Sequence, residues 1–342
     1  MNHPVYPVGK LPVDVLKQVL NRAPVRDSRV IVGPGIGIDC AVLDMGDQAL
    51  VIKTDPITFV TGEIGWYLVQ INANDIATTG AAPRWLMVTM LLPEGKTTPE
   101  LIDQISEQVN AACQKLNISV IGGHTEITYA LDRPILVGTM MGEVAKENLL
   151  TTRGALPGDR ILLTKGVPIE ATAILAREFP HKLEEVLSPE QIEQAANYLH
   201  DPGINVVRDA RVALEAGHVT TMHDPTEGGL ASALWEVALA SGHKLVFSPQ
   251  AVPVPELSAI ICQTFQIDPL SAIASGALLL TARPESAPQI LQAEAEAGIL
   301  CADIGEVQEG EASVWMRTDQ GESLLPHPKR DEIARLFSET TS

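Results

Sequence analysis

The chain has 342 residues, which suits two domains of about 150 residues each, and its 45% hydrophobic and 20% charged content is sufficient for a sizeable core. Its 24 Lys and Arg residues against 43 Asp and Glu residues give a net charge of −19. This balance argues against nucleic acid or an anionic membrane as the main partner, because both need clustered basic residues. An acidic protein that handles an anionic substrate would instead need metal ions between the two.

The cysteines and the first residues indicate a cytoplasmic protein. The four cysteines, Cys40, Cys113, Cys262 and Cys301, are tens of residues apart and form no C-x-x-C pair, so we expect reduced, buried thiols and no zinc site. The start of the chain lacks the basic and apolar regions of a signal peptide. The longest apolar stretch, Trp85–Leu92, is too short to span a bilayer.

The first half of the chain alternates strand and helix patterns. Turn residues between Asp39–Leu43 and Ala49–Thr54 predict a β-hairpin. Further elements are predicted, in order, as a helix over Gly65–Thr79, a strand over Trp85–Leu92, a helix from Pro99 with a Thr97–Glu100 capping box, and strands over Ser119–Ile121 and Pro134–Val144. This interleaving predicts a mixed α/β or α+β fold.

A turn-rich segment, Thr151–Asp159, predicts the boundary between domains spanning residues 1–150 and 151–342. The second half repeats the alternation of the first. Its strands are expected at Arg160–Thr164, Val219–Met222, Lys244–Phe247 and Ala277–Ala282, and its helices at Ile169–Phe179, Gly203–Ala216, Glu227–Ala240 and Asp331–Phe337. Two halves of similar size suggest a shared cleft.

Two candidate sites precede the first helix. The alternate glycines of Gly33–Asp39 allow the backbone to approach a ligand closely, but the spacing matches neither a Rossmann nor a P-loop fingerprint, and a surface loop is the alternative. Lys53 and Asp55 lie two apart on a strand and therefore face the same side. They either form a surface ion pair or bracket a metal-bound phosphate.

The predicted helix over Gly65–Thr79 carries a polar stripe. Asn72, Asp75 and Thr79 are three and four residues apart and so share one face. A solvated face is the usual explanation for such a stripe. The stretch has no Lys or Arg and no charge besides Asp75, so we favour a lined cleft.

Two glycine pairs mark candidate phosphate sites. Gly122-Gly123 follows a predicted strand and precedes His124, Thr125 and Glu126, which are capable of ligating a metal; a structural histidine is the alternative. In His223–Gly229 a polar loop with Asp224 and Thr226 leads into a helix starting at Gly228-Gly229, whose N–H groups favour an anion. An ordinary N-cap is the alternative.

Jointly these loops present several carboxylates beside glycine or threonine. The carboxylates are those of Asp39, Asp55, Asp75, Glu126 and Asp224. Mg²⁺ is typically held by one or two carboxylates together with substrate phosphates. Magnesium would therefore make this acidic chain compatible with a polyphosphate.

The ordered motifs resemble one known superfamily. Asp55–Phe59 (DPITF), Asn74–Arg84 (NDIATTGAAPR), Gly122–Glu126 (GGHTE) and Asp224–Leu230 (DPTEGGL) are similar to those of the aminoimidazole ribonucleotide (AIR) synthase superfamily. Within it, the chain most resembles the hydrogenase expression/formation protein HypE and HypE-like AIR synthase-related proteins. The resemblance spans about Gly33 to Val307.

The resemblance implies an N-terminal α/β domain that dimerises through its sheet, a C-terminal α+β domain, and ATP with Mg²⁺ in the cleft between them. A cytoplasmic homodimer active in hydrogenase maturation would fit this family. By position, the resemblance implies metal or phosphate sites at Asp39, Asp55 and Asp75 and a phosphate loop at Asp224 and Thr226. Together with the residue patterns above, we expect metal ligands at Asp39, Asp55, Asp75, Glu126 and Asp224, and cofactor-binding residues at Lys53, Asn72, Gly122, Gly123, His124, Thr125, Thr226, Gly228 and Gly229.

Two departures from HypE limit the reaction that is implied. HypE reacts on a C-terminal cysteine, whereas this sequence ends in Thr341-Ser342 and its last cysteine is Cys301. His124 stands where relatives usually have Asp, and imidazole is a poorer Mg²⁺ ligand than carboxylate. We therefore expect an ATP- and Mg²⁺-dependent enzyme that activates an oxygen of an unidentified small-molecule or protein substrate. The alternatives are a small-molecule kinase like thiamine-monophosphate kinase and a non-catalytic nucleotide-binding partner protein.

Overall fold

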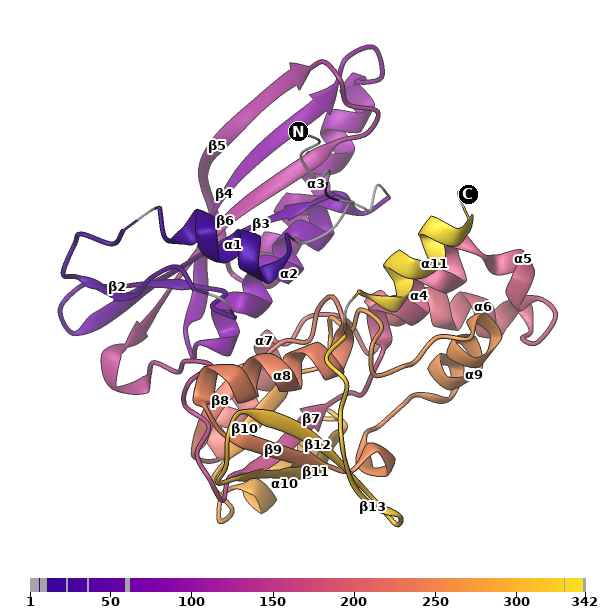
Figure 1. Ribbon diagram of the computed structural model, residues 1–342. Helices are drawn as coiled ribbons and strands as arrows, with labels where there is room; N and C mark the ends of the chain where they lie inside the picture. Colours follow the sequence, from indigo (N-terminus) through magenta and orange to yellow (C-terminus); the bar gives the residue numbers. More distant parts are fainter. Residues whose placement is uncertain are drawn as a thin grey trace, which may run out of the picture.

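The computed structural model describes residues 6, 11–22, 24–35, 37–58, 62–328 and 330–340. Two β-sheets, each covered by helices, occupy separate halves of the molecule (Figure 1). The predicted mixed α/β class with two domains is therefore confirmed. The segment Thr151–Asp159 lies between the last strand of the first sheet and the first strand of the second. Among the described residues, no helix combines the length and apolar character that a membrane crossing requires.

The N-terminal sheet has six strands. Their order is β1 (Val30–Val32), β2 (Ala41–Asp44), β3 (Gln48–Ile57), β6 (Ile135–Ala145), β4 (Ala82–Pro93) and β5 (Ser119–Thr128). Only β4 and β5 pair in parallel. The predicted hairpin is confirmed as β2 and β3, which pair antiparallel from Ala41–Ile52 to Asp44–Ala49.

Two helices cover one face of this sheet, and a short helix, α1 (Val13–Leu20), precedes it. Helix α2 (Ile64–Thr78) packs against β3 and β6, and α3 (Pro99–Lys115) packs against α2. The N-cap of α3 is Thr98, whose side chain accepts from Leu101 N, so the predicted capping box at Thr97 is wrong. Thr97 instead donates its hydroxyl to the carbonyl of Pro93, which ends β4.

The second sheet has seven strands. Their order is β13 (Gly321–Leu324), β12 (Ser313–Thr318), β9 (Lys244–Phe247), β11 (Cys301–Gln308), β7 (Arg160–Thr164), β10 (Leu279–Ala282) and β8 (Val219–His223). Helix α8 (Gly229–Ser241) packs on one face with the odd-numbered residues of β7. Helices α7 (Val207–Ala216) and α10 (Ala287–Glu296) pack on the other face with Leu162. The strand period of two therefore divides the core into two layers.

The remaining helices gather beside the second sheet, where Figure 1 shows α11 next to α4. They are α4 (Ile169–Glu178), α5 (Pro180–Leu183), α6 (Pro189–Ala196), α9 (Glu256–Phe265) and α11 (Glu332–Thr340), with short 3-10 turns η2 (Asn197–Leu199) and η3 (Pro249–Ala251). A further 3-10 turn, η1 (Lys146–Asn148), directly follows β6 of the first sheet. Three of the four predicted buried thiols are buried, and Cys301 is half-buried.

Helix α2 is buried on nearly all sides because α3 and the C-terminal domain cover the sides that the sheet leaves free. Asn74 donates to the carbonyl of Ile204 at 2.7 Å and accepts from Val206 N at 2.9 Å. Gln70 accepts from Asn205 at 2.9 Å. These amides, on the side of α2 away from the predicted stripe, set how the domains meet.

Replacing Asn74 tests this docking. Asn74→Ala leaves the buried Ile204 carbonyl and Val206 N–H without partners, so we expect the free energy of unfolding to fall by about 2–4 kcal/mol. Urea denaturation measures the change. Asn110→Ala, at an exposed position of α3, is the matched control and should stay within about 0.5 kcal/mol of wild type. Equal effects of the two substitutions would contradict the assignment.

Candidate functional site

Three of the predicted aspartates surround one lysine. Lys53 Nζ lies 3.1 Å from Asp75 Oδ2, 3.6 Å from Asp55 Oδ2 and 3.8 Å from Asp39 Oδ1. Burial by itself would lower the pKa of Lys53, but attraction to Asp75, Asp39 and Asp55 outweighs it and raises that pKa. The ammonium group is therefore a fixed positive charge within this carboxylate cluster.

Local structure explains why these residues meet. On β3 the alternation that buries Ala49 and Val51 against α2 continues to Lys53 and Asp55, which face the same helix. Asp75 stands in the last turn of α2, which passes over this part of the strand. Asp39 reaches the cluster because it lies two residues before β2, the hairpin partner of β3.

Asp224 reaches the cluster from the second domain. It follows β8 directly, is 1% exposed, and its Oδ2 has no hydrogen-bond partner. Burial raises the pKa of Asp224 to about 7; repulsion by Asp39 adds to the shift, and attraction to His223 and Lys53 opposes it. Burial likewise raises the pKa of Asp75 well above its usual range, and repulsion by Asp224 is the next cause. The two buried carboxylates therefore oppose each other across the domain boundary.

Two further residues of the cluster escaped assignment from the sequence. His223 Nε2 contacts Glu236 Oε2 of α8 at 2.5 Å, and His223 Nδ1 lies 3.7 Å from Asp39 Oδ2. Burial lowers the pKa of His223, but the bond and attraction to Glu236 outweigh it and raise that pKa to about 9. His223 precedes Asp224 in the sequence motif and could have been assigned from it, whereas no sequence motif marks Glu236. Together they place a second cation beside Asp39.

Asn72 lies beneath the sheet and does not line a cleft. It is fully buried, donates to the carbonyl of Leu68 at 2.9 Å, and faces Gly138 of β6, the strand partner of Asp55. Its Oδ1 has no partner. Helix α2 thus turns Asn72 toward the strands, and its role in binding a cofactor stays a prediction.

Gly122–Glu126 forms part of strand β5, whereas a loop after a short strand was expected. Gly123 pairs with Val88, Val88 with Gly138, and Gly138 with Asp55. Three strand spacings of about 4.8 Å separate Gly123 from Asp55 by about 14 Å. His124 and Glu126 are exposed and contact each other at 3.1 Å. Within one chain, Gly122, Gly123, His124, Thr125 and Glu126 are thus separate from the carboxylate cluster.

The N–H groups at the start of α8 already have protein acceptors. Gly228 N donates to Asp331 Oδ2 at 2.7 Å, and Gly229 N donates to the carbonyl of Thr226 at 2.9 Å. Both glycines have positive φ, +80° and +61°, which explains the glycine pair. A phosphate at the Gly228 N–H, as the sequence suggested, would require the Asp331 bond to break.

The donor chemistry of the cluster fits magnesium held together with phosphates. Asp75 Oδ2 and Asp224 Oδ2 are buried, and neither has a hydrogen-bond partner; the Lys53 contact to Asp75 is at ion-pair distance without hydrogen-bond alignment. Carboxylate oxygens are hard ligands, as Mg²⁺ requires. Over the described part of the chain, no group of three or more His, Cys, Asp or Glu residues is arranged so that it could hold a metal ion by itself. An open site completed by substrate phosphates is the arrangement that matches both observations.

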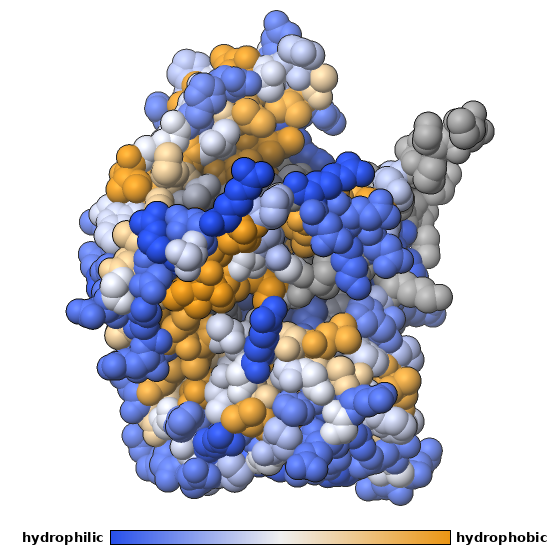
Figure 2. Space-filling model, turned by 60° about the vertical axis from the view of Figure 1, so that its left-hand side comes forward, coloured by the Kyte–Doolittle hydropathy of each residue, from blue (hydrophilic) through white to orange (hydrophobic). Residues whose placement is uncertain are grey.

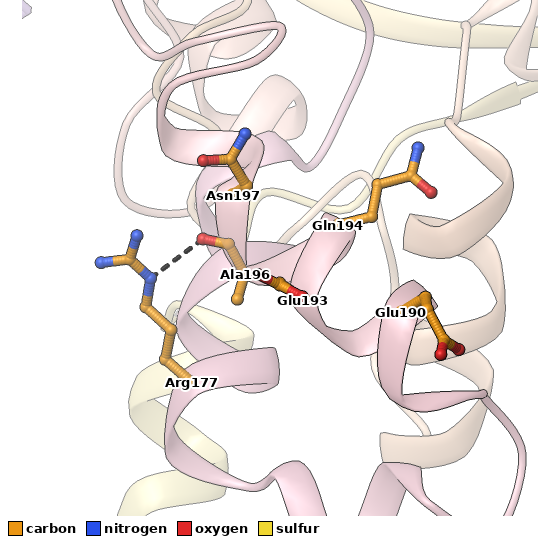
Figure 3. A pocket seen from close by; sticks show the side chains of 6 residues that line it. All are labelled: Arg177, Glu190, Glu193, Gln194, Ala196 and Asn197. Carbon is orange, nitrogen blue, oxygen red and sulfur yellow. Dashed lines mark hydrogen bonds between the residues drawn. The ribbon is translucent and has the colours of Figure 1, made fainter.

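A separate surface hollow of about 460 Å³ lies on the helices of the second domain (Figure 3). It is lined by Arg177, Glu190, Glu193, Gln194, Ala196 and Asn197. Arg177 donates to the carbonyl of Ala196 and also pairs with Glu63 at 2.6 Å. Its one cation is thus engaged in structural contacts, and none of its lining residues belongs to the carboxylate cluster.

Fold and site together define a two-domain α/β protein with a cluster of carboxylates at the domain junction. The chain matches the AIR synthase related protein family, with the N-terminal domain at residues 37–144 and the C-terminal domain at residues 157–316. It is 30% identical to the carbamoyl dehydratase HypE of Cupriavidus necator, over 80% of this chain and 77% of that one. The chain therefore belongs to the AIR synthase related family.

Solved structures share this architecture. A crystal structure of the hydrogenase maturation protein HypE in complex with ATP has a TM-score of 0.69 and 25% identity, covering 92% of this chain and 90% of that one. Thiamine monophosphate kinase from Aquifex aeolicus has a TM-score of 0.67 and 17% identity, covering 91% and 97%. The second similarity shows the common fold alone.

The raised pKa of Asp224 gives a test of the cluster without nucleotide. Because this pKa rises from 3.8 to about 7 on folding, the folded chain binds more protons than the unfolded chain between those values. Stability conferred by this position is therefore lost as pH rises from about 4 to 7. In EDTA, Asp224→Asn should raise the free energy of unfolding at pH 8 by on the order of 2 kcal/mol, and by little at pH 4.5.

Urea denaturation at both pH values measures this difference. Asp47→Asn, at an exposed position of the turn between β2 and β3, is the matched control and should show no pH-dependent gain. Destabilisation by Asp224→Asn at pH 8 would disprove the proposed repulsion.

Proposed function

We propose that the chain is an ATP- and Mg²⁺-dependent enzyme that activates an oxygen of its substrate by phosphoryl transfer. The observation that carries the proposal is the convergence of Asp39, Asp55, Asp75 and Asp224, from separate segments of two domains, around Lys53. The HypE structure in complex with ATP, which has the same fold, supports ATP as the nucleotide.

The charges at the junction explain why a metal would be needed. Lys53 and His223 balance the four carboxylates only in part, so a bare polyphosphate would meet net negative charge once all four are ionised. Asp75 and Asp224, whose buried oxygens lack hydrogen bonds, are the residues best placed to hold Mg²⁺. The bound metal would supply charge neutralisation for the transferred phosphoryl group.

The protein contributes positioning in this proposal. Lys53 is held by three aspartates, so its ammonium group keeps one place beside the metal ligands. His223, anchored by Glu236, orients Asp39 from the opposite domain. Fixed groups of this kind lower the barrier by orienting the reactants and by meeting developing charge without reorganisation.

We propose that the protein acts as a homodimer formed through the open face of the N-terminal sheet. A shallow groove of about 420 Å³ on the face opposite α2 is lined mainly by apolar side chains, including Leu50, Trp85, Ile121 and Met141. Strand β5 is an edge strand exposed on both faces. Figure 2 brings this side of the molecule forward and shows a broad apolar band there.

A second copy is the occupant that best suits this surface. An uncovered edge strand with apolar neighbours invites pairing or aggregation unless another chain covers it. The same strand carries Gly122–Glu126. In this proposal any ligand role of His124 or Glu126 belongs to the dimer, because within one chain both residues lie away from the cluster.

Calorimetry with ATP in the presence and absence of Mg²⁺ tests the nucleotide site. We expect wild type to bind ATP more tightly with Mg²⁺, and Asp75→Asn to weaken Mg²⁺-dependent binding about tenfold or more, as loss of a charged contact implies. Asp47→Asn is the matched control. Equal ATP binding in all conditions would refute the proposal. If the protein binds ATP but releases no ADP with any acceptor substrate, the non-catalytic partner protein is favoured. ADP release that depends on an added vitamin phosphate would favour the kinase alternative.

Light scattering after size-exclusion chromatography tests the dimer. Ile121 is 54% exposed at the apolar groove, so Ile121→Glu should convert a wild-type dimer to monomers by placing a charge in the interface. Val186→Glu, at a 52% exposed position on the second domain, is the matched control and should stay dimeric. A monomeric wild type, or a dimeric Ile121→Glu variant, would argue against this interface.

A further inference from the structure

The chain after the second sheet runs back along helix α8. Its path, residues 325–328 and 330–331, is called the C-terminal strap here. Trp235 of α8 donates its indole N–H to the carbonyl of Leu325 at 3.2 Å, and its ring lies 5.5 Å from that of His327. Pro328 Cβ stands 3.7 Å from where a Cβ of Gly228 would be. Figure 1 shows this yellow segment passing α8 on its way to α11.

The strap ends at Asp331, whose carboxylate serves two helix starts. Asp331 Oδ2 accepts from Gly228 N at 2.7 Å, and Asp331 Oδ1 accepts from Ile333 N at 2.8 Å. The first bond reaches the loop that leads into α8, and the second caps α11. One side chain therefore joins the C-terminal helix to the loop that begins at Asp224.

Helix α11 is held firmly enough to act as an anchor. Ile333 is buried in the large core cluster, and the ring of Phe337 lies 5.4 Å from that of Phe179. Glu332 N donates to the carbonyl of Ser271 at 3.3 Å. The position of Asp331 is thus set by the core of the second domain.

The loop from Asp224 to Gly228 depends on such an anchor. Gly228 has no side chain with which to hold its own place, and its φ of +80° is a conformation that other residues rarely adopt. On the far side, Ala231 N donates to the carbonyl of Leu270 at 2.9 Å, which fixes the first turn of α8. The Asp331 bond completes the hold on the side that faces the strap.

We propose that Asp331 is a positioning residue for the nucleotide site: by holding the Gly228 N–H, it fixes the loop that presents Asp224 to Asp75. This inference rests on the proposed function, since its readout is magnesium-dependent ATP binding. The alternative is that the Asp331 carboxylate occupies the position of a ligand phosphate at the Gly228 N–H and so inhibits nucleotide binding. The two readings predict opposite changes in affinity.

Substitution of Asp331 distinguishes them. In calorimetry on the full chain, Asp331→Ala should weaken ATP binding with Mg²⁺ by about tenfold, the loss expected for a charged hydrogen bond, and should weaken binding without Mg²⁺ less. Asp331→Asn retains a carbonyl oxygen for the Gly228 N–H and should recover most of the affinity. Asp319→Ala, in the exposed turn between β12 and β13, is the matched control and should bind as wild type does.

Hydrogen exchange provides a readout that needs no nucleotide. Asp331→Ala should speed amide exchange in residues 224–229 while leaving the later turns of α8 unchanged. Unchanged exchange in this loop would overturn the inference, as would unchanged or tighter Mg²⁺-dependent binding by Asp331→Ala. Failure of wild type to bind ATP with Mg²⁺ would refute the proposed function itself, and the exchange result would still decide whether Asp331 holds the loop.

Discussion

The structure at the domain junction is constrained by two buried carboxylates, Asp75 and Asp224, which have too few positive charges nearby to neutralise the cluster. Both carboxylates are almost fully buried, each has an oxygen without a hydrogen-bond partner, and each raises the pKa of the other or of its neighbours through repulsion. Burying unpaired charge is costly, and proteins retain such arrangements chiefly at functional sites. The surrounding structure therefore has to hold these groups together against their own repulsion.

The two domains are held together beside the cluster by hydrogen bonds from uncharged amide side chains. Asn74, one residue before Asp75, binds the backbone of the second domain with both ends of its amide. The backbone that Asn74 binds, at Ile204 and Val206, is itself held by Lys165. The Lys165 ammonium group donates to the carbonyl of the intervening Asn205 and pairs with Asp209 at 3.2 Å. The docking residues Gln70 and Asn74 thus lie on the same helix as Asp75, so the helix that supplies a carboxylate to the cluster also fixes how the second domain meets the first.

The local parts of this arrangement could be predicted from the sequence, whereas the contacts between distant segments could not. The β2–β3 hairpin puts Lys53 and Asp55 on one face, and helical spacing puts Asp75 toward them, because both follow from fixed periods. Gly122-Gly123 misled the interpretation, since a glycine pair after a short apolar run is typical of a loop, yet pairing with β4 extends the strand through it. The contact of Glu236 with His223 and that of Asp331 with Gly228 arise only through the packing of α8 and α11, for which no short motif exists.

The acidity of the chain as a whole does not create the electrostatics of the junction. Many of its carboxylates form solvent-accessible ion pairs, such as that of Glu306 with Arg317. Such pairs contribute little to stability because water screens the charges. The same charges become decisive only where helix α2 and the second domain exclude water from Asp75 and Asp224. Metal dependence is thus expected to follow from how closely the two domains and the loop before α8 are held together, and changes of surface charge elsewhere should leave it intact.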